Sequence, residues 1–180
     1  VDERLLMYGR GLYPRFNFSK AKKQLMMFSP HSIWITNTKT MKSSIAEKIG
    51  VKHDRATMSG LLGFSTANDI NRGALDNQVK PNMIDEIQEE KSENMIQHML
   101  SLMESGETII SVGKKQIITK AFCSLVFIAN PIENENVNKG RIDGYGKNLV
   151  ESFREVIRKL TLNYAAVGSR IACILFGDDF

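Results

Sequence analysis

Two segments carry residues suited to phosphoryl transfer at positions where a strand is expected to end. The first, Thr36-Asn-Thr-Lys-Thr-Met-Lys-Ser43, ends in the Lys-Ser pair that closes the phosphate-loop pattern G-x-x-x-x-G-K-[ST]. In that pattern the lysine contacts the β- and γ-phosphates and the hydroxyl binds Mg²⁺. Thr36 and Met41 stand where the pattern has its glycines. Because Lys-Ser is common in ordinary loops, the segment alone leaves both interpretations open.

The second segment is Pro81-Asn-Met-Ile-Asp-Glu86, which places two adjacent carboxylates after a strand candidate. Such carboxylates can position a metal ion and polarise an attacking water molecule. The alternative is the solvated start of a helix, because further glutamates follow at residues 89, 90 and 93. Acidic residues favour a helix N-terminus on electrostatic grounds alone.

Two further segments place one polar residue beside an expected strand. In Phe127-Ile-Ala-Asn-Pro131, Asn130 follows an apolar run, a position that can touch ligand in an open α/β sheet. Asn-Pro is also a frequent start of a turn. In Gly168-Ser-Arg-Ile171, Arg170 precedes the last strand candidate, although a lone arginine is usually a surface residue.

Strands that alternate with helices must position these segments. Apolar runs and their periodicity predict strands at residues 32–36, 79–84, 123–129 and 171–176. Helices are expected at residues 20–28 and 43–50, after the Ser92 cap up to residue 103, and at residues 149–160. A β-hairpin is expected at residues 108–119, and residues 54–82 and 134–146 are expected to be mostly loop. The alternation predicts a parallel sheet covered on both faces.

Composition is that of one globular domain, with 180 residues of which 42% are hydrophobic and 24% charged. It excludes a disordered chain and a disulfide scaffold, and no run approaches the ~18 apolar residues of a membrane span. We expect Cys123 and Cys173 to be buried thiols. Residues 1–60 hold 11 Lys and Arg against 4 Asp and Glu, which suits a polyanion, either nucleic acid or nucleotide phosphate. Because it begins at Val1 and stops after an apolar run, we expect the chain to be part of a longer polypeptide.

In their order along the chain, the four segments match a P-loop ATPase. The sequence resembles the AAA+ ATPase core of minichromosome maintenance (MCM) replicative helicases and their mobile-element relatives over roughly residues 20–176. The segments that carry the resemblance are Gly60-Leu-Leu-Gly63, Gly73-Ala-Leu-Asp76, Ile84-Asp-Glu86, Met103-Glu104, Glu107–Lys115, Cys123–Pro131 and Ser169-Arg-Ile171.

This resemblance implies a fold and an organisation. The fold would be an αβα sandwich with a parallel central sheet and a pre-sensor-1 β-hairpin. Residues 31–180 would form the ATPase core, and residues 1–30 a basic arm or linker. The family's helical lid would begin where this chain ends, so the lid would be missing.

The resemblance also implies roles for single residues. The loop that would bind ATP comprises Asn37, Thr38, Lys39, Thr40, Met41, Lys42 and Ser43. Lys42 would contact the phosphates, and Ser43 and Asp85 would hold Mg²⁺. Glu86 would orient or deprotonate the attacking water, and Asn130 would contact that water or the γ-phosphate. Arg170 would act on the nucleotide of a neighbouring subunit. Lys114 and Lys115, at the hairpin tip, would contact DNA.

The implied function is an ATP-driven motor of a DNA helicase or replication protein. It would assemble as a homo-oligomer, a hexameric ring in the intact protein, without contact to a membrane. It would act in the cytoplasm at the nucleoid, or in the nucleus of a eukaryote. The glycine-free loop leaves two alternatives open: a degenerate AAA+-like subunit that binds DNA or assists assembly, and a AAA+ ATPase that remodels proteins.

Overall fold

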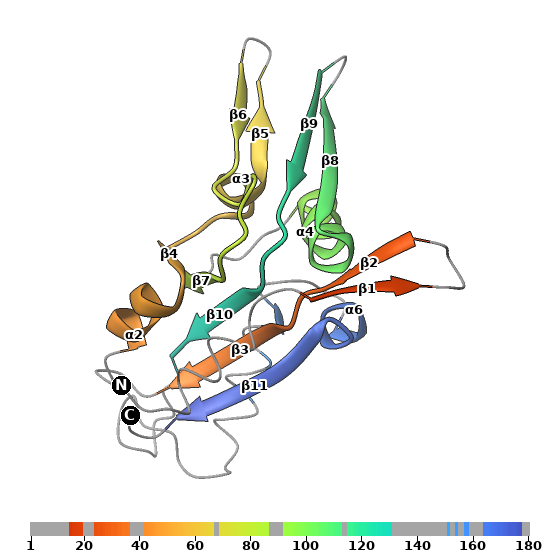
Figure 1. The fold of residues 1–180 in the computed structure, drawn as a ribbon. Coiled ribbons are helices and arrows are strands. Elements are labelled where there is room, and N and C mark those ends of the chain that lie inside the picture. Colours follow the sequence, from red (N-terminus) through yellow and green to blue (C-terminus); the bar gives the residue numbers. More distant parts are fainter. Residues whose placement is uncertain are drawn as a thin grey trace.

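The central feature of the fold is a five-stranded parallel sheet. The computed structural model describes residues 15–19, 24–36, 42–66, 69–86, 92–112, 115–130, 151, 154, 157, 158 and 164–177. The order of the sheet is β11-β3-β10-β7-β4, and every neighbouring pair is parallel (Figure 1). Its strands are β3 (His31–Thr36), β4 (Val51–Asp54), β7 (Asn82–Asp85), β10 (Leu125–Ala129) and β11 (Ile171–Gly177). The predicted α/β class with a parallel sheet is confirmed.

Four of these strands were expected from the sequence, and β4 was not. Three of its four residues are polar, which suits a half-buried strand at the edge of the sheet but gives no apolar pattern to recognise. It follows helix α2 (Lys42–Ile49) after Gly50 alone. A Cβ at Gly50 would lie 2.0 Å from the carbonyl oxygen of Pro81, so only glycine lets the chain turn here. The Val51 N–H then donates to that same oxygen at 2.8 Å and begins the pairing with β7.

Helices cover both faces of the sheet. Because side chains alternate along a strand, Trp34 lies on one face while Ile33 and Ile35 lie on the other. Helix α2 packs on the Trp34 face, where the buried residues are Trp34, Ala46, Met83, Val126 and Ile128. On the opposite face lie α3 (Met58–Leu62), α4 (Glu93–Ser105) and α6 (Tyr164–Gly168). The helices and sheet therefore form three layers.

Helix α4 starts after the Ser92 cap, as the sequence predicts, and extends two residues beyond the expected end at residue 103. The Ser92 hydroxyl accepts a hydrogen bond from the Met95 N–H at 3.4 Å, and Gly106 ends the helix in the left-handed conformation. Met99 and Met103 of this helix lie in the core.

Two β-hairpins extend from the side of the sheet that α3 and α4 cover. The pair β8 (Glu107–Val112) and β9 (Lys115–Lys120) confirms the predicted hairpin. The pair β5 (Gly63–Ser65) and β6 (Ile70–Arg72) lies in the region expected to be mostly loop. The hairpins pack together through β5 and β9 and extend in the same direction (Figure 1). The Thr119 hydroxyl joins their bases by donating to the Leu62 carbonyl at 2.7 Å.

The helix expected at residues 20–28 is wrong. Residues Gln24–Phe28 form strand β2, which pairs antiparallel with β1 (Arg15–Ser19). Leu, Met, Gln and Lys favour a helix, but backbone pairing with a partner strand overrides that modest local preference. Both strands lie within the stretch expected to be an arm.

Some expectations fall partly or wholly outside the described residues. The loop at residues 134–146 does so entirely, as do Cys173's side-chain surroundings. Of the helix expected at residues 149–160, positions 151, 154, 157 and 158 are described, and all four are helical. Cys123 is a free, buried thiol, and burial raises its pKa to about 12. Within the described part of the chain, no helix is both long and apolar enough to cross a membrane.

His31 joins three elements at the amino end of the sheet. Its Nδ1 accepts the Leu125 N–H of β10 at 3.0 Å, which leaves Nε2–H to donate to the Met103 carbonyl of α4 at 2.8 Å. The pKa of His31 is lowered to about 4, mainly by burial; the hydrogen bond to the Met103 carbonyl acts against this shift, and the nearby Arg170 guanidinium acts in the same direction as burial. A second proton on the ring would have to displace the Leu125 N–H. The neutral ring is therefore a structural requirement.

We expect acid to destabilise the chain through His31. Between pH 6.5 and about 4 the unfolded state binds the proton and the folded state does not, so stability rises with pH across this window. From pH 7 to pH 5, wild type should lose about 2 kcal/mol more than His31→Gln, which does not titrate. Urea unfolding followed by the fluorescence of the single tryptophan, Trp34, measures this. His98→Gln is the control, and identical pH profiles for wild type and His31→Gln would contradict the assignment.

Candidate functional site

The carboxyl ends of the sheet strands form the candidate site. Strand register aligns Ile35 of β3 with Ala129 of β10, and Ile128 of β10 with Asp85 of β7. Asp85 in turn lies opposite Asp54 of β4. The loop after β3, the Asp85-Glu86 pair and Asn130 are thus brought to the same edge.

This edge contains a topological switch point between β3 and β10. The connection from β3 leads through α2 to β4, on one side of β3, whereas the chain after β10 returns in β11, on its other side. Ligands of open α/β sheets bind outside the strand ends where neighbouring connections diverge in this way. Topology therefore selects the carboxyl ends of β3 and β10 as the candidate place for a ligand.

The phosphate-loop residues are only partly described. Asn37, Thr38, Lys39, Thr40 and Met41 lie outside the described residues. Lys42 and Ser43 are the first two residues of α2, and their side chains are likewise not described. A helix start after a strand is where backbone N–H groups and the helix dipole attract phosphate.

Asp85 is the buried acid of the site. Its side chain is 13% exposed at the end of β7, and its backbone carbonyl accepts the Arg55 N–H at 2.9 Å. Mg²⁺ is usually held by one or two carboxylates together with substrate phosphates. One buried carboxylate at a strand end fits Mg²⁺ that is bound mainly through a nucleotide. Among the described residues, no three His, Cys, Asp or Glu side chains gather into a metal site of their own.

Glu86 differs from Asp85 in exposure and backbone. Its backbone is left-handed, with φ +52°, and Arg55 at the end of β4 is also left-handed, with φ +48°. Non-glycine residues in this region carry strain, which is often found at functional sites. Arg55 Nε lies 3.4 Å from Glu86 Oε2, and both side chains are more than half exposed. An exposed pair of this kind is weak, about 0–1 kcal/mol, so Glu86 can exchange its partner.

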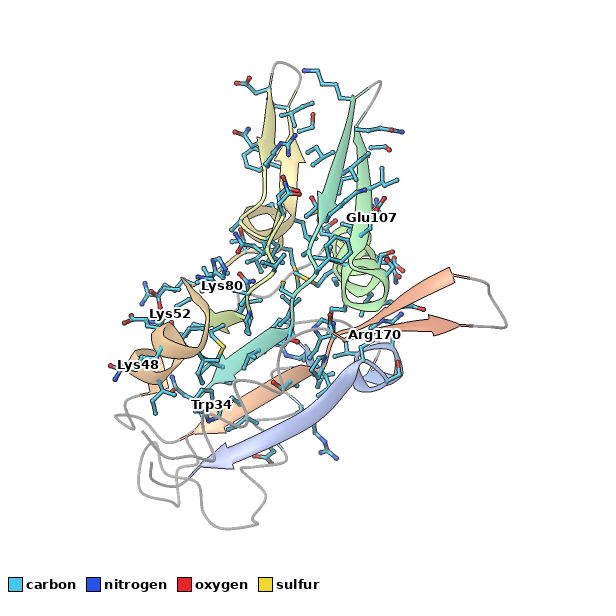
Figure 2. All side chains as sticks on the ribbon, in the orientation of Figure 1. Trp34, Lys48, Lys52, Lys80, Glu107 and Arg170 are labelled. Carbon is cyan, nitrogen blue, oxygen red and sulfur yellow. The ribbon has the colours of Figure 1, made fainter. Side chains whose placement is uncertain are left out.

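Lys52 is a site residue that sequence reasoning missed. Its Nζ lies 2.6 Å from Asp54 Oδ1 and 3.9 Å from Asp85 Oδ2, and its side chain is 14% exposed (Figure 2). The hydrogen bond to Asp54 raises the pKa of Lys52 despite burial, and the charges of Asp54, Asp85 and Glu47 contribute in the same direction. The only signal in the sequence is the alternation Lys52-His-Asp54, which places both charged residues on one face of a strand too short to recognise.

Arg170 lies away from this edge. It precedes β11, whose first residue, Ile171, is aligned with His31, whereas its last residue, Gly177, is aligned with Thr36. Arg170 is therefore at the amino edge of the sheet (Figure 2). Its guanidinium donates to the carbonyl oxygens of Leu100, at 3.2 Å, and Ala166, and pairs with Glu104. The structure does not bring Arg170 together with the other predicted site residues of its own chain.

The β8–β9 hairpin has a buried and an exposed face. Ile110 and Ile117 face inward, whereas Ile109 and Ile118 are 46% and 48% exposed. An ion pair of 3.3 Å between Glu107 and Lys120 closes the base of the outer face. Lys115 begins β9, and Lys114 lies outside the described residues.

Comparison with known proteins does not identify a family. No protein-family model and no curated protein matches the sequence. The site therefore has to be interpreted from its own geometry.

We expect Arg170→Ala to destabilise the chain by about 2 kcal/mol, because the substitution leaves two carbonyl groups and Glu104 without this donor. The measurement is urea unfolding followed by Trp34 fluorescence. Arg154→Ala, which changes an exposed arginine, should cost less than about 0.5 kcal/mol. Equal stability of the two variants would show that the guanidinium is not held by these contacts.

Proposed function

We propose that this chain is the ATP-hydrolysing core of a AAA+ motor of the type found in MCM helicases. The observation that carries the proposal is the convergence of the loop after β3, Asp85-Glu86 and Asn130 at the switch point of the sheet. The strand order is compatible with a P-loop fold. A Rossmann-like sheet shares this general architecture, so the residue types at the edge, rather than the sheet, favour phosphoryl transfer.

In this proposal, each residue at the carboxyl edge of the sheet has a separate role in ATP hydrolysis. Lys42 contacts the β- and γ-phosphates, while Ser43 and Asp85 hold the Mg²⁺ that neutralises phosphate charge. Asn130, which is exposed after β10, contacts the γ-phosphate or the attacking water. Glu86 accepts a proton from that water as oxygen bonds to the γ-phosphorus. The bond from phosphorus to the bridging oxygen breaks, and ADP and phosphate result.

The position of Arg170 favours action between subunits. At the opposite edge of the sheet it is remote from its own chain's phosphate loop, so a role in hydrolysis requires a second copy. In a homo-oligomeric ring, hexameric in the intact protein, Arg170 leaves its ion pair with Glu104 and contacts the nucleotide bound to the neighbouring subunit. Arginine fingers of this kind increase the rate by about 10³–10⁵ in other NTPases.

DNA is the proposed polymer partner, with Lys114 and Lys115 providing the contact at the turn of the β8–β9 hairpin. One observation favours a second candidate, a AAA+ ATPase that remodels proteins. The exposed pair Ile109 and Ile118 on the same hairpin is apolar, and apolar side chains suit a protein surface better than phosphates. Direct binding measurements separate the two.

We expect the chain to bind ATP with Mg²⁺ in isothermal titration calorimetry. Lys42→Ala should weaken binding about tenfold to a hundredfold, because it removes a charge-assisted contact to phosphate. Asp85→Ala should abolish the gain in affinity that Mg²⁺ gives, while binding in EDTA stays unchanged. Lys48→Ala is the matched control, since Lys48 is an exposed lysine of the same helix. If wild type binds no ATP, the proposal is wrong for this chain.

We also expect the chain to bind single-stranded DNA, with an affinity that falls as salt rises. Replacing both Lys114 and Lys115 by alanine should reduce the slope of log K against log salt by about 1.4, since each phosphate contact contributes about 0.7. Fluorescence anisotropy with a labelled oligonucleotide measures this slope, and Lys120→Ala at the hairpin base is the control. DNA binding without any ATP binding would favour the degenerate DNA-binding subunit. Absence of DNA binding would favour the protein remodeller.

A further inference from the structure

Lys52 has two carboxylate neighbours at unequal distances. Its ammonium is in direct hydrogen-bond contact with Asp54, at 2.6 Å, and stands 3.9 Å from Asp85. The two acids differ in environment, because the Asp54 side chain is 70% exposed and that of Asp85 only 13%. The cation is therefore anchored on the solvated acid and lies next to the buried one.

Strand geometry places these three side chains on one face of the sheet. Lys52 and Asp54 are two residues apart on β4, and Asp54 is aligned with Asp85 on β7. Asp85 is aligned with Ile128, which packs on the face covered by α2. Glu47 of α2 adds a further negative charge on this face. The group thus lies on the face of the sheet that α2 covers.

An ammonium ion beside a carboxylate competes with any other cation for it. Opposite charges within about 4–6 Å interact strongly, and more so where water is partly excluded. Were Lys52 to bind Asp85 directly, a divalent ion would have to displace it. The hydrogen bond to Asp54 instead holds the Lys52 ammonium 3.9 Å from Asp85 Oδ2.

We propose that Lys52 is a positioning residue that sets the affinity of Asp85 for a divalent cation, and that Asp54 is its anchor. This inference rests on the proposed function, in which Asp85 holds Mg²⁺. Lys52 offsets part of the negative charge at the edge, so a divalent ion alone binds weakly. Asp54 keeps the Lys52 ammonium from binding Asp85 directly, where it would compete with the divalent ion.

The test is a titration of the nucleotide-free, full 180-residue chain with Mn²⁺, followed by the loss of the free-ion signal in electron paramagnetic resonance. Lys52→Met removes the charge and keeps a similar length of side chain. It should bind Mn²⁺ about tenfold more tightly than wild type. Asp54→Asn should bind about tenfold more weakly, since the ammonium is released toward Asp85. Asp85→Asn should remove the binding.

The double variant distinguishes an effect through Lys52 from a direct effect of the Asp54 charge. If Asp54 acts by anchoring Lys52, then Lys52→Met combined with Asp54→Asn should bind Mn²⁺ as Lys52→Met does. A tenfold loss in the double variant as well would overturn the anchoring role. A purely structural role would not produce this pattern of opposite signs and non-additivity.

Matched control variants make the same changes of net charge at positions away from Asp85. Lys80→Met removes an exposed lysine just before the amino end of β7 (Figure 2), and Asp69→Asn removes an exposed acid before β6; neither should change Mn²⁺ affinity. If Lys52→Met does not fold, as judged by circular dichroism, Lys52→Gln serves as the second variant.

The outcomes for this inference and for the proposed function are separable. Mn²⁺ affinities that are equal in wild type, Lys52→Met and Asp54→Asn, or no Mn²⁺ binding by wild type, would overturn the inference even if ATP binds. The expected Mn²⁺ pattern without ATP binding in calorimetry would support the inference and remove the ATPase proposal.

Discussion

Parallel pairing of β3 with both β10 and β11 is the constraint on which the rest of the structure depends. Parallel neighbours cannot be joined by a short turn, so each strand is followed by a crossover that leaves at one edge and returns at the other. The crossovers must also cover both faces, and the fully buried Trp34 and Ile33 on opposite faces reflect that need. Segments that follow the strands consequently gather at one edge, however far apart they are in the sequence.

The polarity of the two edges follows from this arrangement. At the amino edge a neutral histidine, His31, satisfies two buried backbone groups, and a charge there would be costly. At the carboxyl edge Asp85 is nearly buried, and the nearby positive charge of Lys52 offsets its cost of desolvation. At the amino edge the buried histidine is thus neutral and the charge of Arg170 is bound by carbonyl oxygens and Glu104, whereas the carboxyl edge keeps Lys52, Asp54 and Asp85 beside one another.

The two hairpins, which extend away from the sheet, show a similar contrast between a packed base and an exposed outer face. The Thr119 hydroxyl, which donates to the Leu62 carbonyl, joins the bases of the two hairpins, and the close backbone approach of Gly73 to Leu61 packs β6 against α3. Their outer residues are under no such packing constraint, and Ile109 and Ile118 remain exposed. A rigid base with an exposed outer face suits contact with a polymer or a protein, in keeping with the two candidate partners.

The strong periodic elements could be predicted without the structure, because their apolar patterns and caps are local signals; they are β3, α2, α4, the β8–β9 hairpin, β10 and β11. The sequence also indicated that Asp85, Glu86 and Asn130 end strands. It could not reveal β4, whose four residues lack a pattern, and it assigned a helix to Gln24–Phe28, where pairing with β1 decided otherwise. Long-range strand pairing brings Lys52 and Asp54 to Asp85 and places Arg170 at the opposite edge. Those relations depend on strand order and register, which are set by long-range packing and leave no trace in local spacing.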